Sequence, residues 1–90
     1  MELEASYPNP FNSKATISYS LEKTDHVALE IYDILGVKVC DLSQGVQNPG
    51  YYKVLWNALD DNGQRVSSGL YIIRLKRGSH ELSGKMTLLK

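Results

Sequence analysis

The strongest constraint on the fold is a dense β-forming run near the end of the sequence. Residues 67–76 read Ser-Ser-Gly-Leu-Tyr-Ile-Ile-Arg-Leu-Lys, and a turn of Arg-Gly-Ser follows at 77–79. Side chains alternate between the two faces of a strand, so Tyr71, Ile73 and Leu75 would share one apolar face while the other face turns basic. The pattern predicts a central strand that is buried on one side.

A second alternating run follows directly. Within residues 80–89, Leu82, Met86 and Leu88 alternate with polar side chains, a pattern typical of a half-buried strand. The two runs and the turn between them predict a C-terminal β-hairpin.

Four earlier segments also carry strand signals and are separated by turn-forming residues. They span residues 15–21, 27–32, 37–42 and 51–58. Gly36 can take the positive-φ position of a tight hairpin turn, and residues 43–50 have the composition of a loop. The spacing of the turns and the lack of an amphipathic helical pattern predict an all-β fold, an antiparallel β-sandwich of about seven strands. Its core is expected to centre on Trp56, with Ile31, Tyr71 and Ile73 around it.

The N-terminal segment is rich in proline. Residues 4–12 read Glu-Ala-Ser-Tyr-Pro-Asn-Pro-Phe-Asn, and each proline fixes φ near about −65° and cannot donate to a sheet ladder. We therefore expect this segment to lie along a sheet edge or over an open end of the core. Tyr7 and Phe11 are its predicted anchors.

Length and composition favour one small domain. We expect residues 1–90 to form a single monomeric unit, with residues 1–6 as a linker or a leftover of cloning. The hydrophobic content of 42% exceeds that of disordered chains, and no apolar run approaches the ~18 residues of a membrane span. The first residues lack the basic and apolar regions of a signal peptide, so an export signal is expected elsewhere on a longer parent chain.

The charges are unevenly distributed although they sum to zero. Residues 1–45 hold three Lys and seven Asp or Glu, hence −4, and residues 46–90 hold seven Lys or Arg and three acids, hence +4. The clustered cations are Arg74, Lys76, Arg77, Lys85 and Lys90. No exposed aromatic residues are interleaved with them to stack on bases, so we interpret them as the solvated outer face of the hairpin and predict no nucleic-acid binding.

The sequence holds few residues of catalytic or metal-binding type. His26 and His80 are the only histidines, Cys40 is the only thiol, and no nucleophile motif is present. Cys40 is interpreted as a small core residue. Residues 60–63, Asp-Asp-Asn-Gly, lack the further oxygen ligands of a calcium loop and are interpreted as a plain turn. We predict neither a cofactor nor a metal site, and no enzymatic activity.

Five motifs in order carry a family resemblance that covers nearly the whole chain. They are Tyr-Pro-Asn-Pro-Phe-Asn at 7–12, Ile-Tyr-Asp-Ile-Leu-Gly at 31–36, Gly50 with Trp56, Ser-Gly-Leu-Tyr at 68–71, and Lys-Met-Thr-Leu-Leu-Lys at 85–90. Together they resemble the type A C-terminal sorting domain of the type IX (Por) secretion system, which is related to the immunoglobulin-like domain of the flagellar hook-capping protein. The resemblance implies an immunoglobulin-like sandwich in which the motif residues are structural: Pro8, Asn9, Pro10, Phe11, Tyr32, Asp33, Gly36, Trp56, Gly69 and Tyr71.

The resemblance implies that the chain is an address on a larger secreted parent. Such a parent crosses the periplasm to the cell surface or the medium. Its expected partners are the outer-membrane translocon, which recognises the domain, and a sortase-like peptidase, which removes it. Because the last strand leads to a sheet edge that a receptor strand could pair with, we predict partner contacts at Lys85, Met86, Leu88 and Lys90.

Two other functions stay open from the sequence. The chain could be a carbohydrate-binding or spacer β-sandwich attached to a polysaccharide-degrading enzyme, with Tyr7, Tyr32 or Tyr51 as stacking platforms. It could also be a hook-capping immunoglobulin-like domain.

Overall fold

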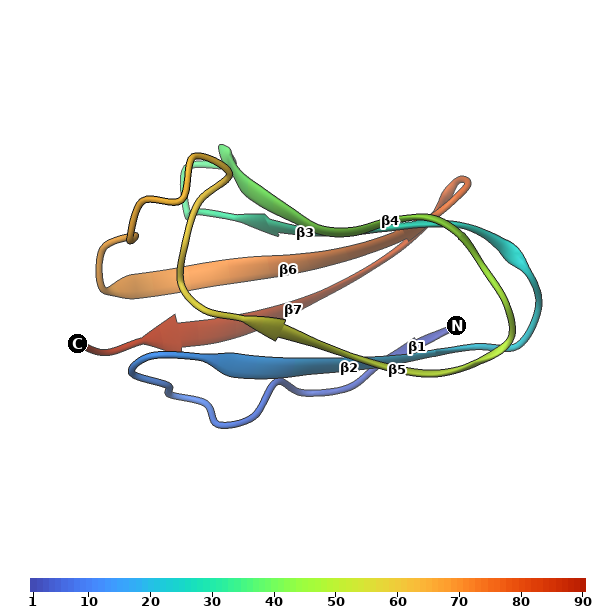
Figure 1. Ribbon diagram of the computed structural model, residues 1–90, viewed down its shortest axis with the longest axis horizontal. Coiled ribbons are helices and arrows are strands. Elements are labelled where there is room, and N and C mark those ends of the chain that lie inside the picture. The colour runs from blue at the N-terminus through green and yellow to red at the C-terminus, as the bar shows by residue number, and fades with distance from the viewer.

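The computed structural model describes all residues 1–90 and contains two packed antiparallel sheets without any helix (Figure 1). The three-stranded sheet has the order β1 (Glu2–Leu3), β2 (Ala15–Leu21), β5 (Gly50–Trp56). The four-stranded sheet has the order β4 (Lys38–Gln47), β3 (Asp25–Tyr32), β6 (Gly69–Arg77), β7 (His80–Leu88). The predicted seven-stranded sandwich is confirmed. No helix in the chain is long and apolar enough to cross a membrane.

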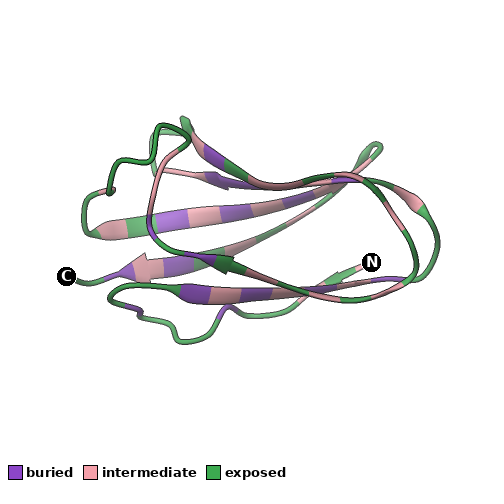
Figure 2. Ribbon diagram, viewed as in Figure 1, coloured by how far each residue is buried: buried purple, intermediate pink, exposed green.

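The central strand and the C-terminal hairpin are as predicted. Tyr71, Ile73 and Leu75 of β6 are buried, and the residues between them are partly exposed, as Figure 2 shows. β7 pairs with β6 in one continuous register from Gly69 opposite Leu88 to Arg77 opposite His80. The period-two pattern thus sets both the face and the register of this hairpin.

Strand β4 is longer than predicted. The sequence predicts its end at Leu42 and a loop over residues 43–50, whereas β4 runs to Gln47. The register with β3 shifts between Ser43 and Asp41, so Leu42 forms a bulge that breaks the apolar alternation. Only Asn48 and Pro49 separate β4 from β5 as the chain crosses to the other sheet.

The N-terminal residues are part of the fold. The linker interpretation of residues 1–6 is corrected here, because Glu2 and Leu3 pair with Ser20 and Tyr19 of β2, and Leu3 packs against the core. Residues 7–12, which we call the strap, lie along the edge of β7, one of the two positions predicted for them. Tyr7 is hydrogen-bonded through its backbone to Thr16, but its side chain is exposed, so the prediction that it anchors the strap is wrong.

An aromatic cluster joins the two sheets to the strap. The ring of Trp56 from β5 lies 5.2 Å from that of Tyr71 on β6 and 5.7 Å from that of Phe11, centroid to centroid. The indole N–H of Trp56 donates to the carbonyl of Leu59 at 2.9 Å, and the hydroxyl of Tyr71 donates to the carbonyl of Ser67 at 2.6 Å. The predicted core around Trp56 is confirmed, since Ile31 and Ile73 are buried as well.

Replacing Trp56 by Ala should destabilise the domain by about 3–5 kcal/mol, because the substitution leaves a cavity where both sheets and the strap meet. Urea unfolding followed by circular dichroism measures this loss. Leu55→Ala is a control on the exposed face of the same strand, with an expected change of about 0.5 kcal/mol. An unchanged unfolding midpoint for Trp56→Ala would remove Trp56 from the core.

Candidate functional site

The four residues predicted to contact a partner separate into two groups. Lys85 and Lys90 are exposed and form no ion pair. Met86 and Leu88 are fully buried, because the even-numbered side chains of β7 point into the core. Their side chains are therefore inaccessible to a partner of the folded domain, and the predicted apolar contact needs another residue.

Leu89 is an exposed apolar side chain next to Lys90. It follows β7 directly and is 53% exposed. With Pro8, Pro10, Phe11 and Asn12 it lines a groove of about 400 Å³. The alternation of β7 places odd-numbered side chains, and therefore Leu89, on the outer face. The sequence identifies Leu89 only if it is already known that the even-numbered apolar side chains from Leu82 to Leu88 face the core.

The strap covers the edge of β7 at the same place. The side-chain amide of Asn9 donates to the carbonyl of Lys85 at 3.1 Å, and its carbonyl oxygen accepts the backbone N–H of Thr87 at 3.0 Å. Phe11 then donates to the carbonyl of Thr87 at 2.9 Å and accepts from the N–H of Leu89 at 2.8 Å. The edge that we expected a receptor strand to pair with is thus already occupied from Lys85 to Leu89.

The opposite edge of the four-stranded sheet is covered in a similar way. The backbone N–H of Asp61 donates to the carbonyl of Val39 at 3.2 Å, and the carboxylate of Asp61 accepts the N–H of Asp41 at 3.1 Å. Asn9 and Asp61 therefore act as short side-chain substitutes for a neighbouring strand. Sequence reasoning missed both roles, because each depends on a partner far away in the chain.

The turn that begins at Asp33 and the turn that begins at Asp60 share one hydrogen-bond pattern. In each, the carboxylate accepts backbone N–H groups from the residues two and four positions later, at 2.9–3.0 Å. The glycine three positions later donates to the Asp carbonyl, and the Asp N–H donates to the carbonyl four positions later. Gly36 and Gly63 have φ of 81° and 79°. The predicted turns at Gly36 and at residues 60–63 are confirmed.

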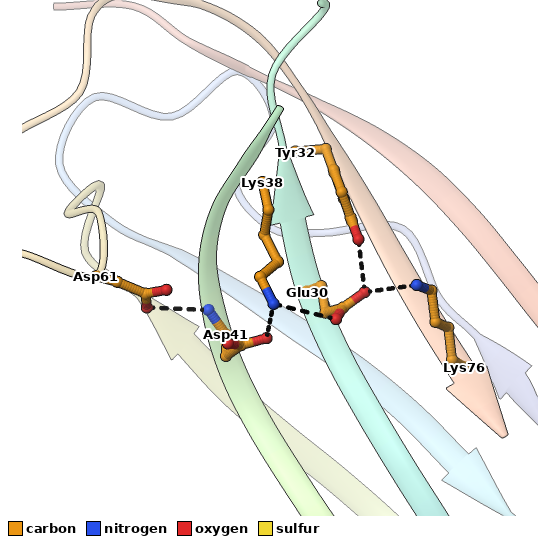
Figure 3. A network of polar contacts seen from close by, with 6 residues as sticks. All are labelled: Glu30, Tyr32, Lys38, Asp41, Asp61 and Lys76. Atoms are coloured by element: carbon orange, nitrogen blue, oxygen red, sulfur yellow. Dashed lines mark hydrogen bonds and ion pairs between the residues drawn. The ribbon is translucent and has the colours of Figure 1, made fainter. Parts of the chain in front are cut away.

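A polar network lies on the outer face of the four-stranded sheet (Figure 3). The carboxylate of Glu30 lies 3.0 Å from the ammonium of Lys76 and 3.6 Å from that of Lys38, and it accepts the hydroxyl of Tyr32 at 2.9 Å. Burial, the largest single influence, raises the pKa of Glu30, but the hydrogen bonds from Lys76 and Tyr32 and the two positive charges outweigh it, so the pKa is lowered overall. Glu30 is thus held as an anion within the sheet.

Most of the predicted basic cluster is neutralised inside the domain. Arg74 lies 3.8 Å from Glu81 and stacks 4.4 Å from the centre of the Tyr32 ring, and Arg77 contacts Glu22 and Asp25. Lys76 pairs with Glu30. Of the five clustered cations, Lys85 and Lys90 alone have no ion pair.

The three tyrosines considered for sugar stacking are not brought together. Tyr32 is half-buried beneath Arg74 on the four-stranded sheet, whereas Tyr51 is exposed on the three-stranded sheet. Tyr7 lies opposite Thr16 and Tyr51 opposite Ser20, four residues or about 13 Å apart along β2.

The fold is that of an immunoglobulin-like β-sandwich whose sheet edges are closed at one end. The family model described as a secretion system C-terminal sorting domain matches residues 5–88, and the chain belongs to this family. It is therefore a sorting module of the type IX (Por) secretion system, part of a larger secreted parent that is exported to the cell surface or the medium.

Solved structures share this fold. The chain is similar to part of dimeric latent PorU from Porphyromonas gingivalis, with a TM-score of 0.75 and 20% identity over 97% of the chain and 9% of PorU. It is similar to FlgD from Xanthomonas campestris, which is described in connection with hook capping, with a TM-score of 0.66 and 23% identity over 94% of the chain and 62% of FlgD. It is also similar to part of PorZ from the P. gingivalis type IX secretion system, with a TM-score of 0.63 and 23% identity over 98% of the chain and 11% of PorZ. No curated protein matches the chain.

Replacing Asn9 by Ala should open the edge of β7. The loss of two hydrogen bonds is expected to cost about 1–2 kcal/mol and to speed up hydrogen exchange at the Thr87 amide. Native-state exchange followed by NMR measures both quantities. Asn12→Ala, in the same strap but at a side chain that makes no hydrogen bond to β7, should leave Thr87 protected. Equal protection in both variants would mean that Asn9 does not cap this edge.

Acid should weaken the fold in part through Glu30. Its pKa lies below the ordinary value of 4.5, so its stabilising contribution is complete above that value and is lost as the pH falls through the lowered pKa. We expect the free energy of unfolding to fall as the pH drops below the ordinary pKa of 4.5, and to fall less in Glu30→Gln than in the control Glu81→Gln. Urea unfolding at several pH values measures the difference, and equal slopes in the two variants would contradict this role.

Proposed function

We propose that the domain acts without catalysis and that the outer-membrane translocon reads it at the end of the sandwich that carries Lys85, Leu89 and Lys90. A sortase-like peptidase would then separate it from its parent. The observation that carries the proposal is the pair of unpaired cations beside an exposed leucine and a groove. Residues 8–14 and 85–90 together hold three lysines and no acid, which suits an acidic, partly apolar segment of a partner.

The placement of the strap supports recognition of the folded surface rather than of a free strand. The edge of β7 is occupied by Asn9 and Phe11, so an added strand would first have to displace the strap. Side chains that project from this end need no such rearrangement. Recognition through Lys85, Leu89 and Lys90 is therefore the simpler mode.

The position of the termini also suits this role. Figure 1 places the N and C termini toward opposite ends of the sandwich. A parent that precedes residue 1 would leave the domain on the side away from Lys90. The domain, proposed to be a single monomeric unit over residues 1–90, could thus present its reading end without hindrance from the cargo.

The residues of catalytic type favour a non-catalytic role. Cys40 is buried, and burial raises the pKa of its thiol to about 12. Cys40 lies opposite Ile31, whereas His26 lies five residues away along β3, or about 16 Å. His80 lies at the β6–β7 turn. A thiolate with a histidine base is not assembled from these residues.

Reversing the two unpaired charges should block export. In a bacterium with type IX secretion, a reporter carrying a signal peptide and residues 1–90 should reach the surface or the medium, and the Lys85→Glu, Lys90→Glu variant should leave it in the periplasm. Both side chains are exposed, so the change in stability should stay within about 0.5 kcal/mol. Deleting residues 85–90 is a poorer test, because it removes two core side chains, Met86 and Leu88.

A matched variant controls for the change of charge. Lys23→Glu with Lys53→Glu reverses two exposed, unpaired lysines elsewhere and should be exported like the parent. Circular dichroism shows whether each variant is folded. Normal export of a folded Lys85→Glu, Lys90→Glu variant would disprove reading of these lysines.

A further inference from the structure

We propose that the apolar tip of the β3–β4 hairpin, residues Ile34, Leu35 and Val37, is an anchor that inserts into an apolar pocket of a partner protein, and that Lys or Arg side chains border this pocket. The inference rests on the proposed function, since the partner would belong to the export machinery. It adds a second contact surface, formed by a different part of the chain from Lys85 to Lys90.

The tip concentrates apolar surface at one point of the molecule. Ile34 is 66% exposed, Leu35 83% and Val37 59%. Single exposed apolar residues are ordinary on protein surfaces, but three within four positions form a patch of the kind that marks interaction sites. None of the three belongs to the core cluster.

The second Asp turn indicates that folding does not require this apolar surface. The turn at Asp60 repeats every hydrogen bond of the turn at Asp33. It carries Asp61 and Asn62 where the first turn carries Ile34 and Leu35, and it has Gln64 in place of Val37. The same backbone geometry thus accepts polar side chains at all three positions. The apolar residues of the tip need an explanation outside the turn itself.

Hydrogen bonds within the turn restrain the backbone of the tip. The carboxylate of Asp33 accepts the N–H groups of Leu35 and Val37 at 2.9 and 3.0 Å, and Gly36 supplies the positive φ that closes the turn. A side chain presented on a fixed backbone loses less conformational entropy on binding than one on a mobile loop. The motif residues Asp33 and Gly36 therefore prepare the tip for insertion.

The charge around the tip favours a protein over an anionic membrane. The two neighbouring segments, residues 33–41 and 57–68, contain four acids and two bases, hence a net charge of −2. A cleft of about 460 Å³ between the two turns has three acids in its lining, Asp33, Asp60 and Asp61, and two bases, Lys38 and Arg65. Anionic headgroups would be repelled from this rim, whereas a protein pocket bordered by Lys or Arg would be attracted. Figure 1 places the β3–β4 turn at the same end of the sandwich as the C terminus, the end at which the proposed recognition by Lys85, Leu89 and Lys90 takes place.

The polar turn provides the sharpest variant. Ile34→Asp, Leu35→Asn and Val37→Gln together copy the Asp60 turn onto the tip, and the turn should still form. In the type IX export assay, we expect this variant to lower the exported fraction of the reporter at least tenfold with an unchanged melting temperature. The control, Val46→Gln with Tyr51→Asn, removes two side chains that are 72% and 89% exposed on other strands, and it should be exported normally. Leu35→Asn alone serves if the triple variant fails to fold.

The outcomes separate this inference from the proposed function. Export of the reporter by the unmutated domain supports the proposed function. If the unmutated domain does not export the reporter, the proposed function itself is wrong. If the parent is exported and the folded tip variant is exported equally well, or no worse than the control, the anchor is disproved. If the purified unmutated domain binds phosphatidylglycerol vesicles and the tip variant does not, the tip contacts a membrane and the proposed protein partner is wrong. If the unmutated domain is a dimer in analytical ultracentrifugation and the tip variant is a monomer, the partner of the tip is a second copy of this chain.

Discussion

The packing of Trp56 between Phe11 and Tyr71 is the contact on which the rest of the structure depends. It joins one strand from each sheet to the strap. The same rings fix the neighbouring loops through hydrogen bonds to the carbonyls of Leu59 and Ser67. Because the strap is anchored through Phe11, Asn9 is held where its side chain can cap β7. The core of this small domain therefore controls the surface at one end of the sandwich as well as the stability of the fold.

Closing the sheet edges is the second constraint. A four-stranded sheet has two outer edges whose unpaired backbone groups invite pairing with other chains. Asn9 and Phe11 cover one of them from Lys85 to Leu89, and Asp61 covers the other at Val39 and Asp41. A secreted parent is exposed to many other chains during export, so a tail with open edges would carry a risk of aggregation. Recognition by projecting side chains is compatible with closed edges. These side chains are Lys85, Leu89 and Lys90 on one part of this end and the apolar tip of the β3–β4 hairpin on another.

Local pattern was sufficient for most of the fold and insufficient for the site. Alternation predicted β2 and the β6–β7 hairpin because each strand has one face in the core and one in water. It failed at residues 43–47, where polar side chains and a bulge hide an edge strand. Asn9 and Asp61 could not be assigned, since their partners are distant in sequence. The sequence analysis assigned Met86 and Leu88 to the partner surface, because two apolar residues beside lysines can belong either to a binding surface or to the core. Only the packing of the folded domain distinguishes these two possibilities. The repeated Asp turn, by contrast, is visible in the sequence as Asp-x-x-Gly at 33–36 and 60–63.

The central claim is that the export machinery reads one end of a folded, edge-capped sandwich. A scan in which every exposed position is replaced in turn by Asp, or by Lys where Asp is already present, tests it most directly, with reporter export as the readout and protease resistance as the measure of folding. The account predicts that export-defective but folded variants cluster at Ile34, Leu35, Lys85, Leu89 and Lys90, while the opposite end around Lys23, Val46 and Ser79 tolerates change. Defects that cluster at that opposite end, or that occur only in unfolded variants, would contradict it.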